Sequence, residues 1–270
     1  MLFRSLLQKS KDGTIKNGVK LHDGLLVESV LIPTESRTTA CVSSQVGCSL
    51  NCEFCATAKL KRMRNLEVAE IVDQVALIDK QSKLYFDRPL SNIVFMGMGE
   101  PMMNYKNVVD AIKKITEEDG LGMSPRRITV STSGIPKMMK MLADENLKVK
   151  LALSLHSAIE HKRNEIMPFS TKFPLTEIME AMQYWYDKTG SRITFEYCVW
   201  KGINDGDEDI KALIKYCKQV PCKVNLIQYN PIGEGKFDHR SVEAEERYVR
   251  ELEKAGITVL VRRSRGGDID

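Results

Sequence analysis

Three cysteines are crowded into one short loop of this chain. Cys48, Cys52 and Cys55 follow the spacing C-x3-C-x2-C, with Phe54 directly before the last. A structural zinc site usually has four protein ligands, and ferredoxin clusters use four cysteines in runs with other spacings. Three thiolates on a [4Fe–4S] cluster leave one iron open to the amino and carboxylate groups of S-adenosylmethionine (SAM). The spacing therefore predicts such a cluster, and zinc ligation or simple burial of the thiols remains the alternative.

Small and polar residues follow several predicted strands. Gly99 lets the backbone approach a ligand closely, and Glu100 beside it has a carboxylate suited to a cationic group. Ser131, Ser154 and Asn230 offer donors and acceptors for a ribose or a carboxylate. These residues are candidate ligand contacts, although each serine is equally suited to capping a helix at a strand-to-helix turn.

Three further residues have types that carry chemistry. His156 stands beside Ser154 and is interpreted as a ligand contact, with a purely structural histidine as the alternative. Glu28 interrupts an otherwise apolar strand pattern, which also fits a side chain facing solvent. Cys41 precedes the cysteine loop, and its pattern alone indicates a small buried apolar residue.

Strand and helix patterns alternate regularly after the cysteine loop. Because no G-x-G-x-x-G follows the first strand, this alternation predicts an α/β fold with a complete or partial barrel rather than a Rossmann sheet. Barrel chemistry collects at the carboxyl ends of the strands. The expected strands are 27–33, 38–43, 91–98, 127–133, 149–155, 192–199, 223–229 and 257–263, and the expected helices begin at 66 and span 105–116, 136–145, 175–188, 207–219 and 242–255.

Composition narrows the class of protein. A chain of 270 residues suits one large domain or two small ones. Seven cysteines, an odd number, without a signal peptide favour a reducing cytosol and metal chemistry over disulfides. The chain has no apolar run of about 18 residues, so no membrane span is expected. A net charge of +4 permits an RNA partner without indicating one.

Basic residues gather at several points that flank the cysteine loop or the strand ends. They are placed to rim one mouth of the barrel and to hold a phosphate backbone. Charge pairs on a solvated face explain them almost equally well. The basic segments are 59–64, 126–127, 162–163 and 262–265.

The cysteine motif resembles that of the radical SAM superfamily. The longer run 41–48 (CVSSQVGC) resembles, more narrowly, the dual-specificity RNA methyltransferases that methylate carbon 2 of adenosine. A sister branch that methylates carbon 8 typically has another residue where Val46 stands, so we prefer the carbon-2 branch. The other matching motifs are GMGEP at 97–101, STSG at 131–134, SLH at 154–156, IMP at 166–168, ND at 204–205 and GDID at 267–270.

The resemblance implies a role for each matching residue. The fold would be a partial (β/α)6 barrel over residues 36–270, preceded by a short N-terminal strand extension over residues 1–35. Glu28 would be the proton acceptor, and Cys41 would resolve a protein–RNA adduct by forming a disulfide. Cys48, Cys52 and Cys55 would hold the [4Fe–4S] cluster, and Gly99, Glu100, Ser131, Ser154, Leu155, His156 and Asn230 would contact SAM.

The resemblance also implies partners and a reaction. The substrates would be adenosines in 23S rRNA and in tRNA, and a flavodoxin or ferredoxin type of protein would supply low-potential electrons. The protein would be a cytoplasmic monomer. Carbon 2 of adenine is electrophilic, so a direct polar transfer from SAM fails, and the family uses a methylated cysteine and radical chemistry. The target base must be unstacked, which favours a single-stranded loop or bulge.

The chain departs from the family pattern at one point. The family continues past Asp-Ile-Asp into Ala-Ala-Cys-Gly, whose cysteine carries the methyl group, and this sequence ends at Asp270. The expectation is therefore a catalytic core that lacks the methyl-carrier cysteine. Two alternatives remain open: a radical SAM enzyme of another reaction class, and an RNA-binding paralogue without methyl transfer.

Overall fold

The backbone of the computed structural model is organised around one large mixed sheet, and the structure describes residues 5–230, 237 and 242–269. Neighbouring strands follow the order β1-β2-β3-β4-β7-β8-β9-β10-β11-β12. Pairs from β1 to β4 are antiparallel, and pairs from β4 onward are parallel. The strands are β1 (Ser5–Lys9), β2 (Ile15–Lys20), β3 (Leu26–Pro33), β4 (Thr38–Cys41), β7 (Asn92–Phe95), β8 (Ile128–Thr132), β9 (Lys150–Ser154), β10 (Ile193–Tyr197), β11 (Cys222–Ile227) and β12 (Thr258–Arg262).

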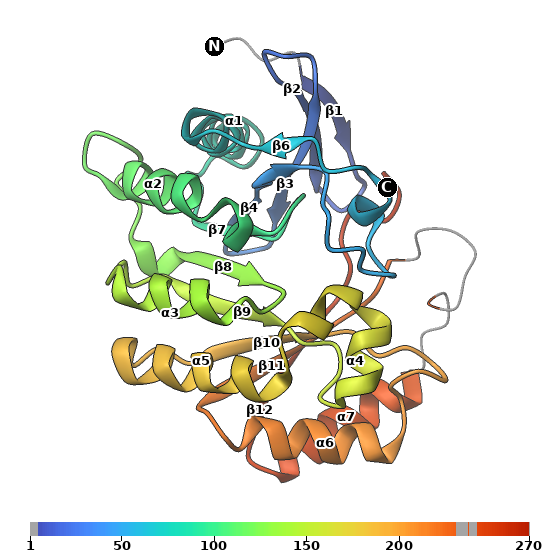
Figure 1. Cartoon of the computed structure of the whole chain (residues 1–270). Helices are drawn as coiled ribbons and strands as arrows, with labels where there is room; N and C mark the ends of the chain where they lie inside the picture. Colours follow the sequence, from blue (N-terminus) through green and yellow to red (C-terminus); the bar gives the residue numbers. More distant parts are fainter. Residues whose placement is uncertain (1–4, 231–236, 238–241, 270) are drawn as a thin grey trace.

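Helices connect the parallel strands and cover the outer face of the curved sheet (Figure 1). Within the described residues the edge strands β1 and β12 do not pair with each other, so the barrel is partial. The predicted α/β partial barrel is confirmed. The helices are α1 (Val68–Phe86), α2 (Tyr105–Thr116), α3 (Pro136–Asp144), α4 (Glu160–Ile166), α5 (Leu175–Thr189), α6 (Asp207–Cys217) and α7 (Val242–Lys254), and a small second sheet pairs β5 (Gln45–Val46) with β6 (Arg64–Asn65).

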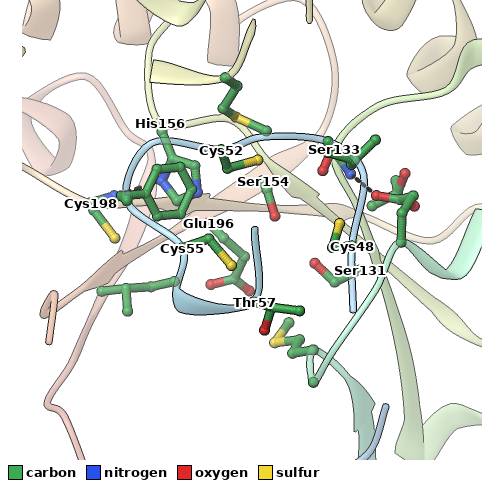
Figure 2. Close-up of a pocket in the computed structure, with 18 of the residues that line it drawn as sticks. Cys48, Cys52, Cys55, Thr57, Ser131, Ser133, Ser154, His156, Glu196 and Cys198 are labelled. Atoms are coloured by element: carbon green, nitrogen blue, oxygen red, sulfur yellow. Dashed lines mark hydrogen bonds between the residues drawn. The ribbon is translucent and has the colours of Figure 1, made fainter. Parts of the chain in front are cut away.

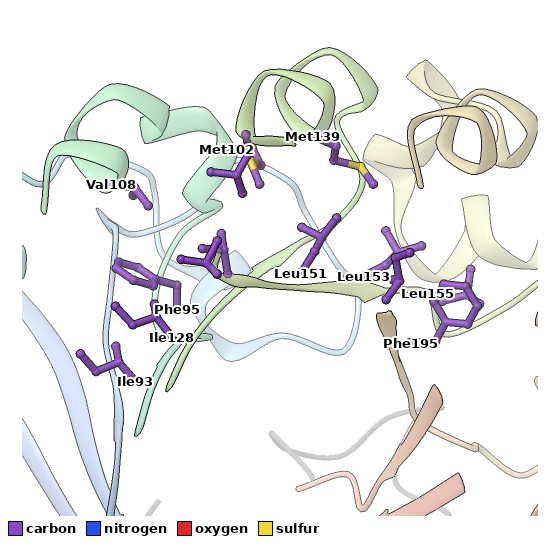
Figure 3. Packing of buried hydrophobic residues seen from close by; sticks show 14 of the residues in the cluster. Ile93, Phe95, Met102, Val108, Ile128, Met139, Leu151, Leu153, Leu155 and Phe195 are labelled. Carbon is purple, nitrogen blue, oxygen red and sulfur yellow. The ribbon is translucent and has the colours of Figure 1, made fainter. Parts of the chain in front are cut away.

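The main core lies between the sheet and these helices. Phe95 on β7 and Leu151 on β9 are buried on parallel strands that flank β8, and Met102 and Met139 meet them from the helical layer (Figure 3). Strands that are buried by helices on one face and enclose a cavity on the other require long apolar runs. This packing explains why the strands of the second half were predictable to within a few residues.

Two parts of the fold differ from expectation. Residues 5–20 form the hairpin β1–β2. A short strand extension was expected here from the resemblance, but the sequence pattern did not predict these two strands, because the buried Asn17 is paired with Gln81 by two side-chain hydrogen bonds of 3.0 and 2.6 Å. Because Asn17 is polar but buried, β2 does not show the alternation of apolar and polar residues by which a strand is recognised in a sequence. Helix α4 was also missed, since Glu160–Ile166 is too short to show a helical period.

The C-terminal segment is bonded to the turn between β1 and β2. Ser10 Oγ donates to Asp268 Oδ1 at 2.5 Å, and the backbone N–H of Lys11 donates to Oδ2 at 3.1 Å. In return, the N–H of Gly266 donates to Asp12 Oδ2 at 3.0 Å. These contacts place most of the GDID motif in a structural joint, and its last residue, Asp270, lies outside the described residues.

Candidate cluster and cofactor site

A cavity of about 490 Å³ opens at the carboxyl ends of the parallel strands (Figure 2). Its position agrees with the rule that barrel chemistry gathers at this end of the sheet. Most of the predicted site residues line it: Cys48, Cys52, Cys55, Gly99, Glu100, Ser131, Ser154, His156 and Asn230.

The cysteine loop forms one wall of this cavity. The N–H of Glu53 donates to the carbonyl of Ile166 at 3.1 Å, which anchors the loop to the end of α4. The backbone N–H groups of Ser49 and Leu50 donate to the sulfur of Cys48. Such N–H donors are among the levers by which a protein tunes iron–sulfur thiolates.

Burial raises the pKa of the Cys48 and Cys52 thiols, and the neighbouring cysteines raise both further. Three adjacent thiolates therefore repel one another unless a cation holds them together. A metal cluster removes this cost, because its iron ions keep coordinating thiols deprotonated. The loop thus fits a group that three thiolates share.

Phe54 fastens the loop to the rest of the barrel. Its ring meets His156 at a centroid distance of 4.6 Å, Trp200 at 5.2 Å and Phe237 at 6.4 Å. These residues form a small apolar cluster separate from the main core. The aromatic residue before the last cysteine therefore positions the loop.

His156 lines the cavity and is also fixed by hydrogen bonds to residues that follow β10. Its Nδ1 accepts from the N–H of Cys198 at 3.2 Å, and its carbonyl accepts from Asn204 Nδ2 at 2.7 Å. Burial lowers the pKa of the imidazole to about 3, and the charge of Arg163 adds to this shift. The ring is therefore neutral, and it lies where it can contact a ligand while fixing the end of β9.

The Gly97–Pro101 segment packs tightly against the chain that enters the cysteine loop. Gly99 has φ +95°, and a Cβ there would lie 2.5 Å from the Cβ of Gln45. Gln45 Oε1 in turn accepts from the N–H of Glu100 at 2.9 Å. Only glycine fits this approach, so the motif joins the second parallel strand to the loop.

Both carboxylate oxygens of Glu100 already have backbone partners. Oε1 accepts from the N–H of Met102 at 3.0 Å, which caps the turn after the strand, and Oε2 accepts from the N–H of Ser133 at 2.7 Å. Burial raises the pKa of Glu100, and these hydrogen bonds act in the opposite direction. Glu100 therefore ties the ends of β7 and β8 together within the cavity wall.

Two wall residues were missed by sequence reasoning, Glu196 and Cys198. Glu196 lies on β10 (Ile193–Tyr197), and Cys198 follows directly after that strand. An acidic residue inside a buried parallel strand was the available signal for Glu196. Cys198 gave no such signal, and burial raises the pKa of its thiol.

Arg163 was also misjudged. It was grouped with basic residues at the rim, but its side chain has 0% exposure. Nη2 donates to the carbonyls of Ser133 at 2.6 Å and Ser154 at 3.3 Å, and among the described residues Nε and Nη1 have no hydrogen-bond partner. Burial lowers the pKa of this guanidinium, and Tyr216, Glu160 and Cys52 act in the opposite direction. Arg163 therefore places a buried positive charge behind the cysteine loop.

Three predicted residues lie outside the cavity wall. Leu155 is fully buried in the main core, and its N–H donates to the carbonyl of Glu196 at 3.0 Å. Glu28 forms an ion pair with Lys16 at 3.2 Å, with 53% of its side chain exposed. Cys41 accepts from the N–H of Met96, and burial raises the pKa of its thiol to about 11.

Strand register relates Cys41 to the cavity nevertheless. Cys41 pairs with Val94, and Val94 pairs with Thr129 on β8, two residues before Ser131. Paired residues on adjacent strands point to the same face of a sheet. Cys41 therefore shares the inner face of the barrel with the cavity residues, although it does not reach the cavity.

Several basic residues of the predicted rim are engaged in ion pairs. Arg64 bonds Glu70 and Asp23, and Lys162 bonds Glu208 and Asp209. A different set, which we call the basic patch, has no carboxylate within ion-pair distance among the described residues. Burial lowers the pKa of its two lysines, and like charge from neighbours in this set lowers it further, while Glu196 acts in the opposite direction on Lys223. The basic patch consists of Arg37, Arg127, Lys150, Lys223 and Arg262.

Among the described residues, none of the helices combines the length and the apolar character needed to cross a bilayer.

Comparison with known proteins identifies the family. Residues 42–217 match the Radical SAM superfamily. The chain is 68% identical, over 98% of its length and 76% of the relative, to "Probable dual-specificity RNA methyltransferase RlmN" of Flavobacterium psychrophilum. The same name describes a Christiangramia forsetii protein that is 68% identical over 98% of this chain and 75% of that protein.

A crystal structure of a radical SAM methyltransferase from Sphaerobacter thermophilus superposes on this structure with a TM-score of 0.96. It has 39% sequence identity and covers 99% of this chain and 79% of that one. The chain therefore belongs to the dual-specificity RNA methyltransferases of the radical SAM superfamily.

Proposed function

We propose that this protein methylates carbon 2 of an adenosine in 23S rRNA and in tRNA, using SAM and a [4Fe–4S] cluster. The observation that carries the proposal is a cavity that three thiols and the polar ends of the parallel strands line together. The thiols are suited to hold the cluster, and the polar strand ends are suited to bind SAM beside it. The names of the relatives in turn supply RNA as the substrate class.

In this proposal Cys48, Cys52 and Cys55 hold the cluster through their thiolates. When bound, the cluster and SAM supply the radical chemistry that an electrophilic ring carbon requires. The wall opposite the cysteine loop binds SAM. Its proposed contacts are Gly99, Glu100, Ser131, Ser154, Leu155, His156 and Asn230, among which Leu155 acts through its backbone position.

Glu28 and Cys41 are proposed to act on the RNA rather than on SAM. Because 53% of the Glu28 side chain is exposed, its carboxylate is accessible to an RNA bound at the surface. Burial raises the pKa of the Cys41 thiol. In the proposed step its sulfur, after losing its proton, bonds the sulfur of the adduct-bearing cysteine while the S–C bond to the RNA breaks, and the released carbon keeps that electron pair and takes up a proton to become the methyl group. That disulfide releases the methylated base from the protein.

The basic patch is proposed to hold RNA phosphates. Its five cations lack carboxylate partners among the described residues, and clustered like charges are relieved when phosphates replace counterions. The reaction also needs a low-potential electron donor of the flavodoxin or ferredoxin type. We propose that the protein works as a monomer.

Anaerobic cluster reconstitution tests the proposal. If the proposed cluster forms, the protein should bind about four iron atoms per chain. Under reducing conditions it should also convert SAM into 5′-deoxyadenosine. Cys52→Ala should abolish both properties, whereas Cys217→Ala, which alters a thiol outside the cavity, should retain them. Zinc in place of iron, or no metal, would refute the proposal.

The position of methylation needs a second assay. Nucleosides from treated RNA are separated to distinguish 2-methyladenosine from 8-methyladenosine, the product of the sister branch. The assay is run on the 270 residues and on a version extended past Asp270 by Ala-Ala-Cys-Gly, so that the methyl-carrying thiol is located directly. Formation of 8-methyladenosine would assign the chain to the other branch.

A further inference from the structure

Glu196 is an acidic side chain of the cavity wall to which the proposed mechanism gives no role. It lies near the carboxyl end of β10 with 5% of its surface exposed. Its carboxyl group projects into the cavity below Cys55 and beside Ser154 (Figure 2). The other cavity glutamate, Glu100, has both oxygens bonded to backbone N–H groups, so the two carboxyl groups are in different situations.

The carboxyl group of Glu196 is only partly satisfied. Oε1 accepts from Asn225 Nδ2 at 2.9 Å, and the described residues supply no hydrogen-bond donor to Oε2. Burial raises the pKa of Glu196 to about 7, against the influence of Asn225 and of the cations Arg262 and Lys223. Because Glu196 lines the cavity, the carboxylate oxygen that no described residue bonds is placed to accept from a donor on a ligand.

The backbone of Glu196 is held firmly. Its carbonyl accepts from the N–H of Leu155 at 3.0 Å and from the N–H of His156 at 3.4 Å. Glu196 pairs with Ser154 on one side and with Asn225 on the other, so the three side chains form a row on the inner face. A donor bound next to Ser154 therefore lies next to Glu196 as well.

We infer that Glu196 accepts a hydrogen bond from a ribose hydroxyl of SAM and thereby positions the nucleoside in the cavity. The inference rests on the proposed function, because it requires SAM beside Ser154. A ribose presents two adjacent hydroxyl donors, and carboxylates commonly accept from them in nucleotide sites. The neighbouring serine provides the small hydroxyl group that such a diol also needs.

Ligand binding without turnover tests this role. S-adenosylhomocysteine and its 2′-deoxy and 3′-deoxy forms are titrated into the reconstituted protein, and each Kd is measured by equilibrium dialysis. For the wild type, one deoxy form should bind about tenfold more weakly, as expected for loss of a hydrogen bond to a charged group. Glu196→Ala should bind S-adenosylhomocysteine about tenfold more weakly and should no longer distinguish that deoxy form.

Two further variants keep the test decisive. Glu196→Gln preserves size and an acceptor oxygen, so it should fold and retain part of the discrimination. Glu145→Gln alters a carboxylate that bonds Lys113 away from the cavity, and it should behave as the wild type. Equal discrimination by the wild type and Glu196→Ala would overturn the inference while leaving the proposed function intact. No binding of S-adenosylhomocysteine by the wild type would overturn both.

Discussion

The ring of Phe54 meets the imidazole of His156 edge-on, with ring centroids 4.6 Å apart and an interplanar angle of 64°. This contact connects the cysteine loop to the end of β9, two elements about a hundred residues apart in the chain. Since burial keeps the imidazole neutral, the contact depends on packing and ring shape rather than on charge. The loop is therefore seated by an aromatic pair next to its last cysteine.

Replacing Phe54 should loosen the cysteine loop. Phe54→Leu keeps an apolar side chain but loses the ring contacts, and aromatic pairs contribute about 1 kcal/mol beyond burial. Phe54→Ala should destabilise the fold by about 3 kcal/mol and should lower the iron content after reconstitution. Urea unfolding and iron analysis measure these effects. Phe169→Leu, which changes an aromatic pair with Phe173 elsewhere, should affect stability alone, and equal iron loss there would contradict the assignment.

Gly99→Ala should be much more harmful than the same change at Gly190. Both glycines have positive φ, so each alanine carries the left-handed strain of about 1 kcal/mol. Only at Gly99 would the new Cβ also lie 2.5 Å from Gln45, whereas nothing lies within 4 Å at Gly190. The melting temperatures of both variants separate the cost of backbone strain from the cost of the steric clash. Equal losses of stability in the two variants would show that the segment around Gly99 relieves the clash by moving, at no cost in free energy.

Arg163→Met should lower the reduction potential of the bound cluster. The buried guanidinium lies behind the cysteine loop, and positive charge favours the reduced, more negative cluster. The expected shift is on the order of tens of millivolts, measured by a spectroscopic redox titration. Arg163→Lys retains the charge and serves as the control. A potential that is the same in both variants would mean that Arg163 acts only by bonding the carbonyls of Ser133 and Ser154.

Acid should weaken the joint between the C-terminal segment and the first hairpin. Hydrogen bonds from Thr14, Gly266 and Ser10 outweigh partial burial and hold the pKa of Asp12 at about 2, below its ordinary value of 3.8. A depressed pKa stabilises the fold fully above the ordinary value, and the contribution is lost as the pH falls from about 4 toward 2. After discounting for exposure, the loss is about 1 kcal/mol.

Urea unfolding of the wild type and Asp12→Asn checks this prediction. The variant should be less stable near neutral pH, and the two proteins should converge in acid. A difference that stays constant across this range would show that the charge of Asp12 is immaterial.

Removing charge from the basic patch should reduce the salt dependence of RNA binding. Lys150→Ala and Lys223→Ala should each lower the slope of log K against log salt concentration by about 0.7–0.9 per lost phosphate contact. Lys137→Ala changes an exposed lysine on the helical side and should leave the slope unchanged. Fluorescence anisotropy with a labelled RNA hairpin gives the slopes. Unchanged slopes for both patch variants would place the RNA elsewhere.

Sequence reasoning predicted the barrel and most of the cavity because both leave local signals. Apolar strand runs such as Leu151–Leu153 have few alternatives in a chain of this length, and the three-cysteine spacing is specific. The β1–β2 hairpin escaped because its buried contact is polar, between Asn17 and Gln81. Arg163 escaped because a charged residue gives no sign of burial until tertiary packing encloses it, whereas the place of Glu196 inside an apolar strand was a signal that was not used.

The hydrogen bonds of Glu100 also fix the shape of one side of the cavity. Its carboxylate joins two strand ends through the N–H groups of Met102 and Ser133, so this side of the cavity is shaped before any molecule enters. A guest molecule then loses its own freedom but does not have to order this wall. Preorganisation of this kind favours tight binding of a rigid nucleoside over that of flexible competitors.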